Sequence, residues 1–306
     1  MSSFDNLSAL IFLKSKVRKW KNVAILLGIL SLLLVVKLIG GEGLSEGFDG
    51  DYIANIKIEG VIFEDDFRSE VLEKVAQDKS IKAVIISIDS PGGGIVGSEI
   101  LFDNLRDIAA NKPVVVVMGS LAASGGYMAA VASDYIIAHN GTLTGSIGVL
   151  MESPEVTDLA NKIGIKFNTY KSSPLKGSPS PFEKSNPMVD KVIKESITDS
   201  FEFFAGLVKD RRGEKLNKKL ESTIFDGRVF TGRKALEAGL IDEIGGKEEA
   251  LSYLAGQKID VKKLEVKEVL ITKEEGKIID KIFGMIPFFN GAKSASSSRQ
   301  IMTIMQ

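Results

Sequence analysis

Apolar residues follow two patterns along this chain: one uninterrupted run near the N-terminus, and a repeating alternation after it. The run Val23–Val36 contains no charged residue, and Leu38-Ile39 extend it past Lys37. A helix needs about 20 apolar residues to cross a bilayer. Asn22 and a lysine whose ammonium reaches the interface would complete that length. We therefore predict a single transmembrane anchor at 22–39.

Charged residues are unequally distributed around this apolar run. A basic leader, 1–21, precedes it, and a linker rich in glycine and acidic residues, 40–51, follows it. Basic residues stay on the cytoplasmic side of a membrane. The asymmetry predicts a single-pass protein of the cell (inner) membrane, with a cytoplasmic N-terminus and an extracytoplasmic or periplasmic domain. A cleaved signal peptide and a buried core helix are the alternatives, and the long leader without a clear cleavage site disfavours the first.

Beyond residue 51, strand-like apolar segments alternate with helical periodicity. Strands are expected at Tyr52–Glu59, Ala83–Ile88, Val114–Met118 and Tyr135–Ala138, and helices at Phe67–Gln77, Ser98–Ala110, Ser124–Ala132, Val156–Ile163 and Val189–Lys209. Such alternation is typical of an α/β domain with a largely parallel sheet. We expect this domain to span 52–256 and, because the chain has no internal repeat, to form one catalytic unit.

Two other parts of the chain have a different character. Serines and prolines in Ser172–Asn186 predict a loop. The region 257–290 combines a strand with an amphipathic helix that packs on its own domain, on a neighbouring subunit or on the membrane surface. The final residues, 291–306, are expected to form a disordered tail.

Composition excludes several classes of partner and chemistry. The net charge of −1 leaves no electrostatic footprint for nucleic acid. The absence of cysteine excludes disulfides and thiolate metal sites. We expect neither a cofactor nor a metal. The single histidine, His139, ends a strand beside Asn140-Gly141, where an ordinary surface residue is more typical than a catalytic one.

A segment of small residues between a strand and a helix contains the most promising nucleophile. Ser124 stands at this transition, within Gly119-Ser-Leu-Ala-Ala-Ser-Gly-Gly-Tyr127. The first N–H groups of a helix have no intrahelical partner, and such donors stabilise a developing oxyanion. The position therefore suits a nucleophilic serine.

A run of three glycines occurs one strand earlier, in Ser90-Pro-Gly-Gly-Gly94. Glycine permits close backbone approach and positive φ. The lysine and hydroxyl residue of a phosphate-binding loop are missing. The segment is therefore either a plain turn or a source of N–H donors for an oxyanion.

With one histidine, an ordinary Ser-His-Asp triad is improbable, which leaves lysine as the general base. A lysine acts as a base only when neutral, so burial must lower its pKa from about 10.4 towards 7 or 8. That shift corresponds to roughly 4 kcal/mol. The residues alone do not select one lysine. Lys176 stands out modestly, because it lies between prolines without an adjacent acid.

Four motifs in the same order resemble those of the signal peptide peptidase A (SppA) family. They are Ser90-Pro-Gly-Gly-Gly94, Gly119-Ser-Leu-Ala-Ala-Ser-Gly-Gly-Tyr127, Thr144-Gly-Ser-Ile-Gly148 and Gly227-Arg-Val-Phe-Thr-Gly-Arg233. The resemblance runs from about Tyr52 to Leu254. It implies a membrane-anchored serine protease with a serine–lysine dyad, on a ClpP/crotonase-like α/β fold of repeated β-β-α units.

The resemblance also implies roles for particular residues. Ser124 corresponds to the family nucleophile, and Lys176 to the general base. Ser146 corresponds to the serine that orients this lysine. The N–H groups of Gly93 and Gly125 correspond to the oxyanion hole.

The loop that carries Lys176 departs from the family pattern at two positions. Ser173 replaces a glycine, and Gly177 stands where relatives commonly have an acidic residue. These departures leave the loop geometry and the substrate preference open. Lys171, Lys184 and Lys191 remain alternative bases.

The sequence thus predicts a serine endopeptidase that degrades remnant signal peptides or other apolar peptides at the extracytoplasmic membrane face. The ring- or dome-like assemblies of the family imply a homo-oligomer. Two alternatives are a protease that processes stomatin-like membrane proteins and an inactive oligomeric membrane scaffold. A crotonase-type acyl-CoA enzyme shares the fold, but an extracytoplasmic domain would have no pool of coenzyme A.

Overall fold

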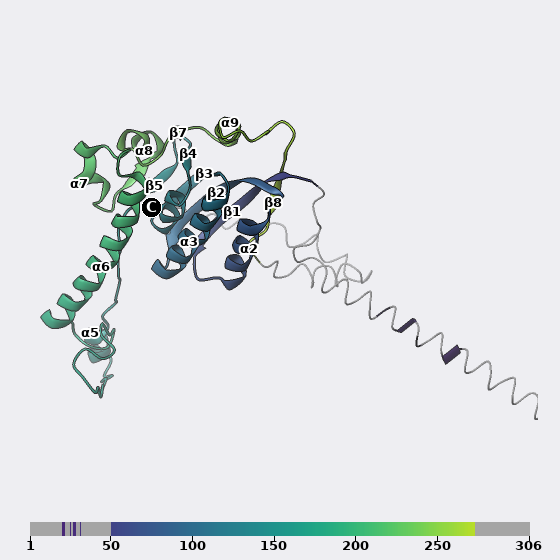
Figure 1. Ribbon diagram of the computed structural model, residues 1–306. Coiled ribbons are helices and arrows are strands. Elements are labelled where there is room, and N and C mark those ends of the chain that lie inside the picture. Colours follow the sequence, from purple (N-terminus) through teal and green to yellow (C-terminus); the bar gives the residue numbers. More distant parts are fainter. Residues whose placement is uncertain (1–19, 22–24, 26, 29–30, 32–49, 273–306) are drawn as a thin grey trace, which may run out of the picture. The chain divides into compact units, whose positions relative to one another are not determined.

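The computed structural model describes residues 20, 21, 25, 27, 28 and 31, and then 50–272 without a gap (Figure 1). Two units divide the chain, and one of them, Gly50–Lys273, contains the fold described below. Most of the predicted anchor at 22–39, most of the linker at 40–51 and the tail at 291–306 lie outside the described residues. Among the residues that are described, no helix is long and apolar enough to cross a membrane.

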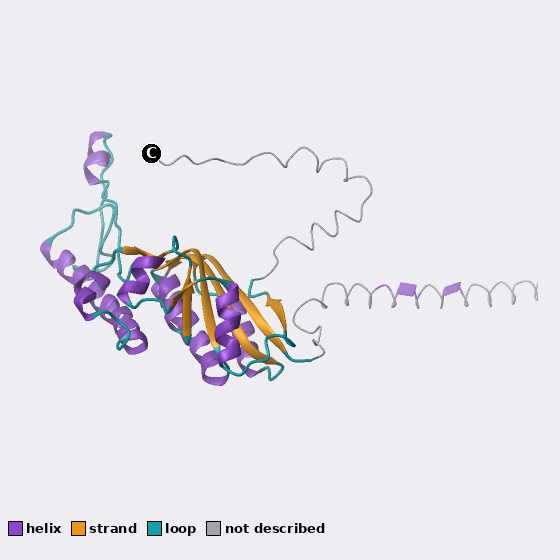
Figure 2. Cartoon of the chain, turned by 90° about the horizontal axis from the view of Figure 1, so that it is seen from above, coloured by secondary structure: helices purple, strands orange, loops and turns teal. Residues whose placement is uncertain are grey.

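A mixed, mainly parallel sheet forms the centre of this unit (Figure 2). Its strands are β1 (Tyr52–Ile62), β2 (Ile81–Gly93), β3 (Val114–Ala123), β4 (Tyr135–Ala138), β5 (Leu143–Gly145), β6 (Val229–Thr231), β7 (Glu243–Ile244) and β8 (Glu265–Val269). The main order is β6-β5-β3-β2-β1-β8, with β4 between β3 and β7. Among these strands only β5 and β6 pair antiparallel. The predicted α/β class is confirmed.

Helices cover both faces of the sheet, which explains why the strands read as nearly continuous apolar runs. The helices are α2 (Asp66–Gln77), α3 (Ile95–Asn111), α4 (Gly125–Val131), α5 (Thr157–Lys162), α6 (Pro187–Arg212), α7 (Glu221–Ile224), α8 (Gly232–Ala238) and α9 (Lys247–Gly256). In β2, Val84 and Ile86 join the core beneath α2, α3 and α4. Ala83 and Ile85 face the smaller core beneath α9.

Three strands, β1, β2 and β3, continue further than their apolar patterns predict. Both β2 and β3 run into their glycine-rich motifs and end at Gly93 and Ala123. The end of β2 pairs with the end of β1, where Ile62 lies opposite Gly93. A register shift after Ile88 carries the β2–β3 pairing into these small residues. Neighbouring strands therefore hold most of the first motif and the first part of the second, up to Ala123.

The compact unit also continues past residue 256, where the predicted protease domain ends. β8 pairs with β1 in parallel, so that Tyr52 lies opposite Glu265. The strand expected in the region 257–290 thus belongs to the central sheet. The amphipathic helix expected in that region falls outside the described residues.

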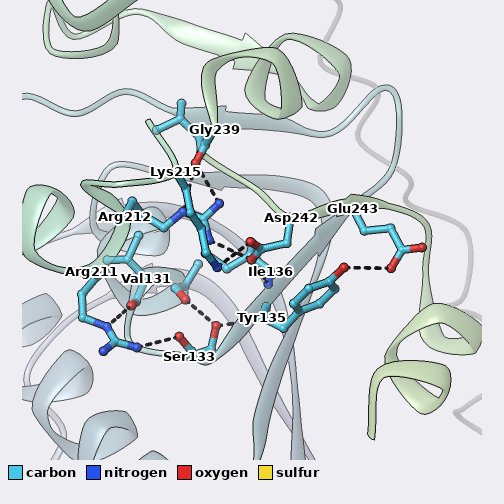
Figure 3. Close-up of polar contacts among 12 residues, drawn as sticks. Val131, Ser133, Tyr135, Ile136, Arg211, Arg212, Lys215, Gly239, Asp242 and Glu243 are labelled. Carbon is cyan, nitrogen blue, oxygen red and sulfur yellow. Dashed lines mark hydrogen bonds and ion pairs between the residues drawn. The ribbon is translucent and has the colours of Figure 1, made fainter. Parts of the chain in front are cut away.

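A buried ion pair connects α6 to the segment that follows α8 (Figure 3). Arg212 Nη1 lies 2.7 Å from Asp242 Oδ2, and the two side chains are only 4% and 7% exposed. Lys215 Nζ and the Ile136 N–H also bond this carboxylate, at 2.8 and 2.9 Å. Burial alone would raise the pKa of Asp242, but these bonds and the charge of Arg212 outweigh it and hold the pKa below its usual value.

The same segments hold α4, the helix that follows Ser124. The Tyr127 hydroxyl donates to the Leu240 carbonyl at 2.8 Å, and burial raises the pKa of Tyr127, which keeps this donor neutral. Arg211 donates to the Val131 carbonyl at 3.1 Å and to the Ser133 carbonyl at 3.0 Å. These bonds fix both ends of α4 against α6 and the segment after α8.

We predict that Asp242→Asn lowers the free energy of unfolding by about 3–5 kcal/mol, because it leaves the Arg212 charge buried without its counter-ion. Urea denaturation of the full-length protein in detergent measures this loss. The matched control is Lys234→Met, which breaks the exposed Lys234–Glu237 pair and should cost at most about 1 kcal/mol.

The same pair predicts a dependence of stability on pH. The folded-state pKa of Asp242 is depressed, so its contribution is present above the unfolded pKa of about 3.9 and is lost as pH falls through the folded value. The stability of the wild type should therefore fall more steeply below about pH 4 than that of Asp242→Asn. Parallel curves for the two proteins would contradict this assignment.

Candidate active site

Ser124 occupies a sharp corner between β3 and α4. Its φ of 53° and ψ of −122° place a non-glycine residue in a region that costs about 1–3 kcal/mol. Two hydrogen bonds hold the corner: the Ser124 N–H donates to the Gly145 carbonyl, and the Ser124 carbonyl accepts from the Met128 N–H, both at 2.9 Å. The side chain is half-buried. Strain that is held in this way is frequent at catalytic sites.

The glycine-rich end of β2 lies directly against this corner. Gly92 has φ +99°, and a Cβ there would lie 2.6 Å from the Gly125 nitrogen and 2.9 Å from Ser124 Cβ. A Cβ on Gly125 would lie 3.2 Å from the Gly93 nitrogen. The fold therefore brings together the two glycines predicted to bind an oxyanion. Gly125 is the first residue of α4, where N–H groups have no intrahelical acceptor.

Two buried serines that the motif analysis did not single out hold the glycine segment. The Ser90 hydroxyl donates to the Gly60 carbonyl at 2.6 Å and accepts the Gly92 N–H at 3.1 Å. The Ser98 hydroxyl donates to the Gly94 carbonyl at 2.9 Å. The sequence did contain a signal for this role, namely a serine on each side of the glycines, because a buried hydroxyl needs a hydrogen-bond partner.

Ser146 lies beside the Ser124 corner because β5 pairs with the end of β3. Ala123 lies opposite Gly145 in this pairing, so each serine directly follows a paired residue. Ser146 also has a positive φ, 50°, and its N–H donates to the Arg228 carbonyl at 2.8 Å. The motif that contains Arg228 thus supports the backbone of Ser146.

Lys176 lies in the segment between β5 and α6, which leaves the sheet and carries α5 (Figures 1 and 2). We call residues 149–186 the arm. Lys176 is exposed, and its N–H donates to the Ser173 carbonyl at 3.1 Å. Within the described part of the chain, its ammonium makes neither a hydrogen bond nor an ion pair, so no such contact joins it to Ser124 or Ser146.

The alternative lysines are each engaged by a carboxylate. Lys171 contacts Glu183, Lys184 lies 2.9 Å from Asp158, and Lys191 lies 3.8 Å from Glu195. An opposite charge favours the protonated form, and the hydrogen bond and charge of Asp158 raise the pKa of Lys184. Of the four lysines considered from the sequence, Lys176 is the one without a carboxylate partner among the described residues.

The single histidine is exposed at the end of β4. The backbone N–H of His139 donates to Thr142 Oγ1 at 3.0 Å. A Cβ added to Gly246 would lie 3.1 Å from Cε1 of the His139 ring. Its ring therefore faces the start of α9. Over the described residues, no group of three or more His, Cys, Asp or Glu side chains could hold a metal ion.

Comparison with known proteins assigns the family. Residues 106–262 match the model of peptidase family S49. The chain belongs to this family. It is 31% identical to the "Putative signal peptide peptidase SppA" of Enterococcus faecium, over 79% of this chain and 81% of the relative. It is also 31% identical to the "Putative protease MJ0651" of Methanocaldococcus jannaschii, over 80% and 82%.

Membership in S49 identifies this chain as a serine protease. Among solved structures, the 1510-N membrane-bound stomatin-specific protease aligns over 72% of this chain and 98% of its own, at 16% identity and a TM-score of 0.45.

We predict that Gly92→Ala lowers the turnover of a peptide substrate by a factor on the order of 100 or more, the loss typical of a damaged oxyanion hole. The new Cβ would meet the Gly125 nitrogen at 2.6 Å, on a backbone with φ +99°. The matched control is Gly206→Ala in α6, because a Cβ there has no atom within 4 Å. It should keep its turnover and its stability, because alanine is favourable in a helix interior. Equal turnover in both variants would contradict this picture of the corner.

Proposed function

We propose that this S49 protease is a membrane-anchored endopeptidase in which Ser124 and Lys176 form a catalytic dyad. The observation that carries the proposal is the strained Ser124 corner, at which the ends of β2, β3 and β5 converge. The proposed nucleophile, the proposed N–H donors and a second hydroxyl belong to this corner. Apart from a general base, these are the groups that acyl transfer requires.

The proposed reaction has two stages. Neutral Lys176 accepts the Ser124 proton while the hydroxyl oxygen attacks a peptide carbonyl, and the N–H groups of Gly93 and Gly125 stabilise the oxyanion. The lysine then protonates the leaving amine, which leaves an acyl-enzyme. Water, deprotonated by the same lysine, attacks the acyl-enzyme, and the lysine returns this proton to the Ser124 oxygen as the acid leaves. Ser146, beside Ser124, orients the lysine.

Assembly of several copies would deliver the lysine. The Lys176 ammonium has no polar partner among the described residues of its own chain, and the arm exposes large apolar side chains at Leu150, Leu159, Ile163 and Tyr170. Burial of such side chains against a second copy is favourable. We infer a homo-oligomer in which the arm of one copy places Lys176 beside Ser124 of a neighbour, where the contact also removes the lysine from water.

Apolar side chains around the glycine segment support an apolar peptide as substrate. Val61 and Phe63 at the end of β1, and Ile95 and Val96 at the start of α3, are exposed and flank Gly92–Gly94. We propose that remnant signal peptides bind here, at the extracytoplasmic face of the inner membrane. The predicted anchor would hold the protease where such peptides leave the bilayer. Processing of stomatin-like membrane proteins remains the alternative role for the protease, whereas an inactive scaffold is disfavoured by membership in S49.

The dyad predicts the behaviour of two single variants. Ser124→Ala and Lys176→Ala should each lower the cleavage rate of an apolar peptide by at least about 10⁴-fold in detergent-solubilised, full-length protein. Lys184→Ala, which removes another exposed lysine of the arm, is the control and should cleave at the wild-type rate. Near-normal turnover in Lys176→Ala would contradict the base assignment. Activity in both dyad variants would exclude the mechanism.

Delivery of the lysine by a neighbour makes a separate prediction. When Ser124→Ala and Lys176→Ala proteins are dissociated, mixed and reassembled, hybrid sites with an intact Ser124 and a neighbouring Lys176 should form. Cleavage should return to at least about a tenth of the wild-type rate, because a fraction of the sites then contains both groups. No recovery, with mixed oligomers demonstrated by differential tags, would show that each chain completes its own site.

A further inference from the structure

We propose that Lys171 and Glu183 form a clamp that closes the loop between them and positions Lys176 at its tip. This inference rests on the proposed role of Lys176 as the general base. It assigns Lys171 and Glu183 a positioning role, in which neither touches the substrate.

This ion pair is more buried than the other one in the arm, between Lys184 and Asp158. Lys171 and Glu183 are 16% and 34% exposed, against 64% and 74% for Lys184 and Asp158. The Lys171 ammonium also donates to Ser178 Oγ at 3.3 Å. The hydrogen bond and charge of Lys171 lower the pKa of Glu183. Partly buried pairs with additional hydrogen bonds constrain geometry more than exposed pairs, whose net stabilisation is small.

Contacts on both sides of the ion pair close the base of the loop. The rings of Phe167 and Phe182 lie 4.4 Å apart between centroids. The Val156 N–H donates to the Pro181 carbonyl at 2.8 Å, which ties the loop to the start of α5. One ionic and one aromatic contact thus join the two ends of the loop, and one backbone hydrogen bond holds the second end against the start of α5.

The tip of the loop has a defined turn rather than an extended course. The Lys176 N–H donates to the Ser173 carbonyl at 3.1 Å, and the Ser178 N–H donates to the Leu175 carbonyl at 3.2 Å. Gly177 has φ +73°, which allows the reversal after Lys176. The clamp and this turn together leave the Lys176 ammonium as the polar end that projects without a partner among the described residues.

Such a clamp has a direct consequence for catalysis. A general base must reach hydrogen-bond distance of the proton that it accepts, and a misplacement of about 1 Å costs on the order of 100-fold in rate. If the loop opened at its base, the Lys176 side chain would sample many positions. The clamp limits this spread before the lysine meets Ser124.

Four variants of the full-length protein in detergent test the clamp. Lys171→Met and Glu183→Gln each remove one charge, and the double variant Lys171→Glu/Glu183→Lys exchanges them. Lys184→Met breaks the exposed pair with Asp158 and is the matched control. Two readouts are needed: amide hydrogen exchange of residues 172–182, and kcat and KM for an apolar peptide.

We expect exchange in the loop to accelerate at least about tenfold in each single variant, because the loop opens locally. We expect kcat to fall about 10- to 100-fold with KM little changed, because the base rather than the substrate is misplaced. The exchanged pair should restore both readouts to within about threefold of the wild type. Lys184→Met should change neither.

Three results would overturn the clamp: unchanged exchange in both single variants, unchanged kcat despite faster exchange, or no rescue in the exchanged pair. The exchanged pair also lacks a lysine at position 171, so rescue excludes Lys171 itself as the base. Failure of the proposed dyad gives a different result. Lys176→Ala would then keep its turnover, whatever the exchange rates of the loop.

Discussion

The backbone corner at Ser124 is the constraint on which the rest of this structure depends. A serine with φ 53° is tolerated only because its N–H and carbonyl are both bonded and because Gly92 and Gly125 leave room for close backbone contact. Side chains at those glycines would collide with the corner. The pairing of β5 with the end of β3 supplies the Gly145 carbonyl and, in the next residue, Ser146. One local geometry thus gathers all the groups proposed for acyl transfer except the base.

A second layer of contacts keeps the corner in place. The whole of α4 is buried, and the buried pair of Arg212 and Asp242 anchors the segments that bond Tyr127. Many contacts therefore hold the proposed nucleophile, whereas the proposed base lies on an arm whose own contacts, led by the pair of Lys171 and Glu183, are local. A nucleophile held in this way and a base brought by assembly would make activity depend on association of the copies.

The fold was largely predictable from the sequence, and the site only in part. Apolar periodicity placed the main strands and helices, because both faces of the sheet are buried. The short strands β5, β6 and β7 were missed, since two or three residues leave no periodicity to detect. Small residues and strand-to-helix order indicated Ser124 without any resemblance. No local sequence pattern shows which lysine becomes buried, because burial depends on contacts from outside the segment that carries the lysine.

Covalent labelling tests the role of the corner most directly. A serine-directed phosphonate should form one adduct with the full-length protein in detergent, and tandem mass spectrometry should locate it on Ser124. Prior unfolding should abolish the reaction, because an ordinary serine hydroxyl is unreactive without the groups that surround it. An adduct on Ser146 or on another serine of the folded protein, or equal labelling after unfolding, would show that the strained corner is not the nucleophilic centre.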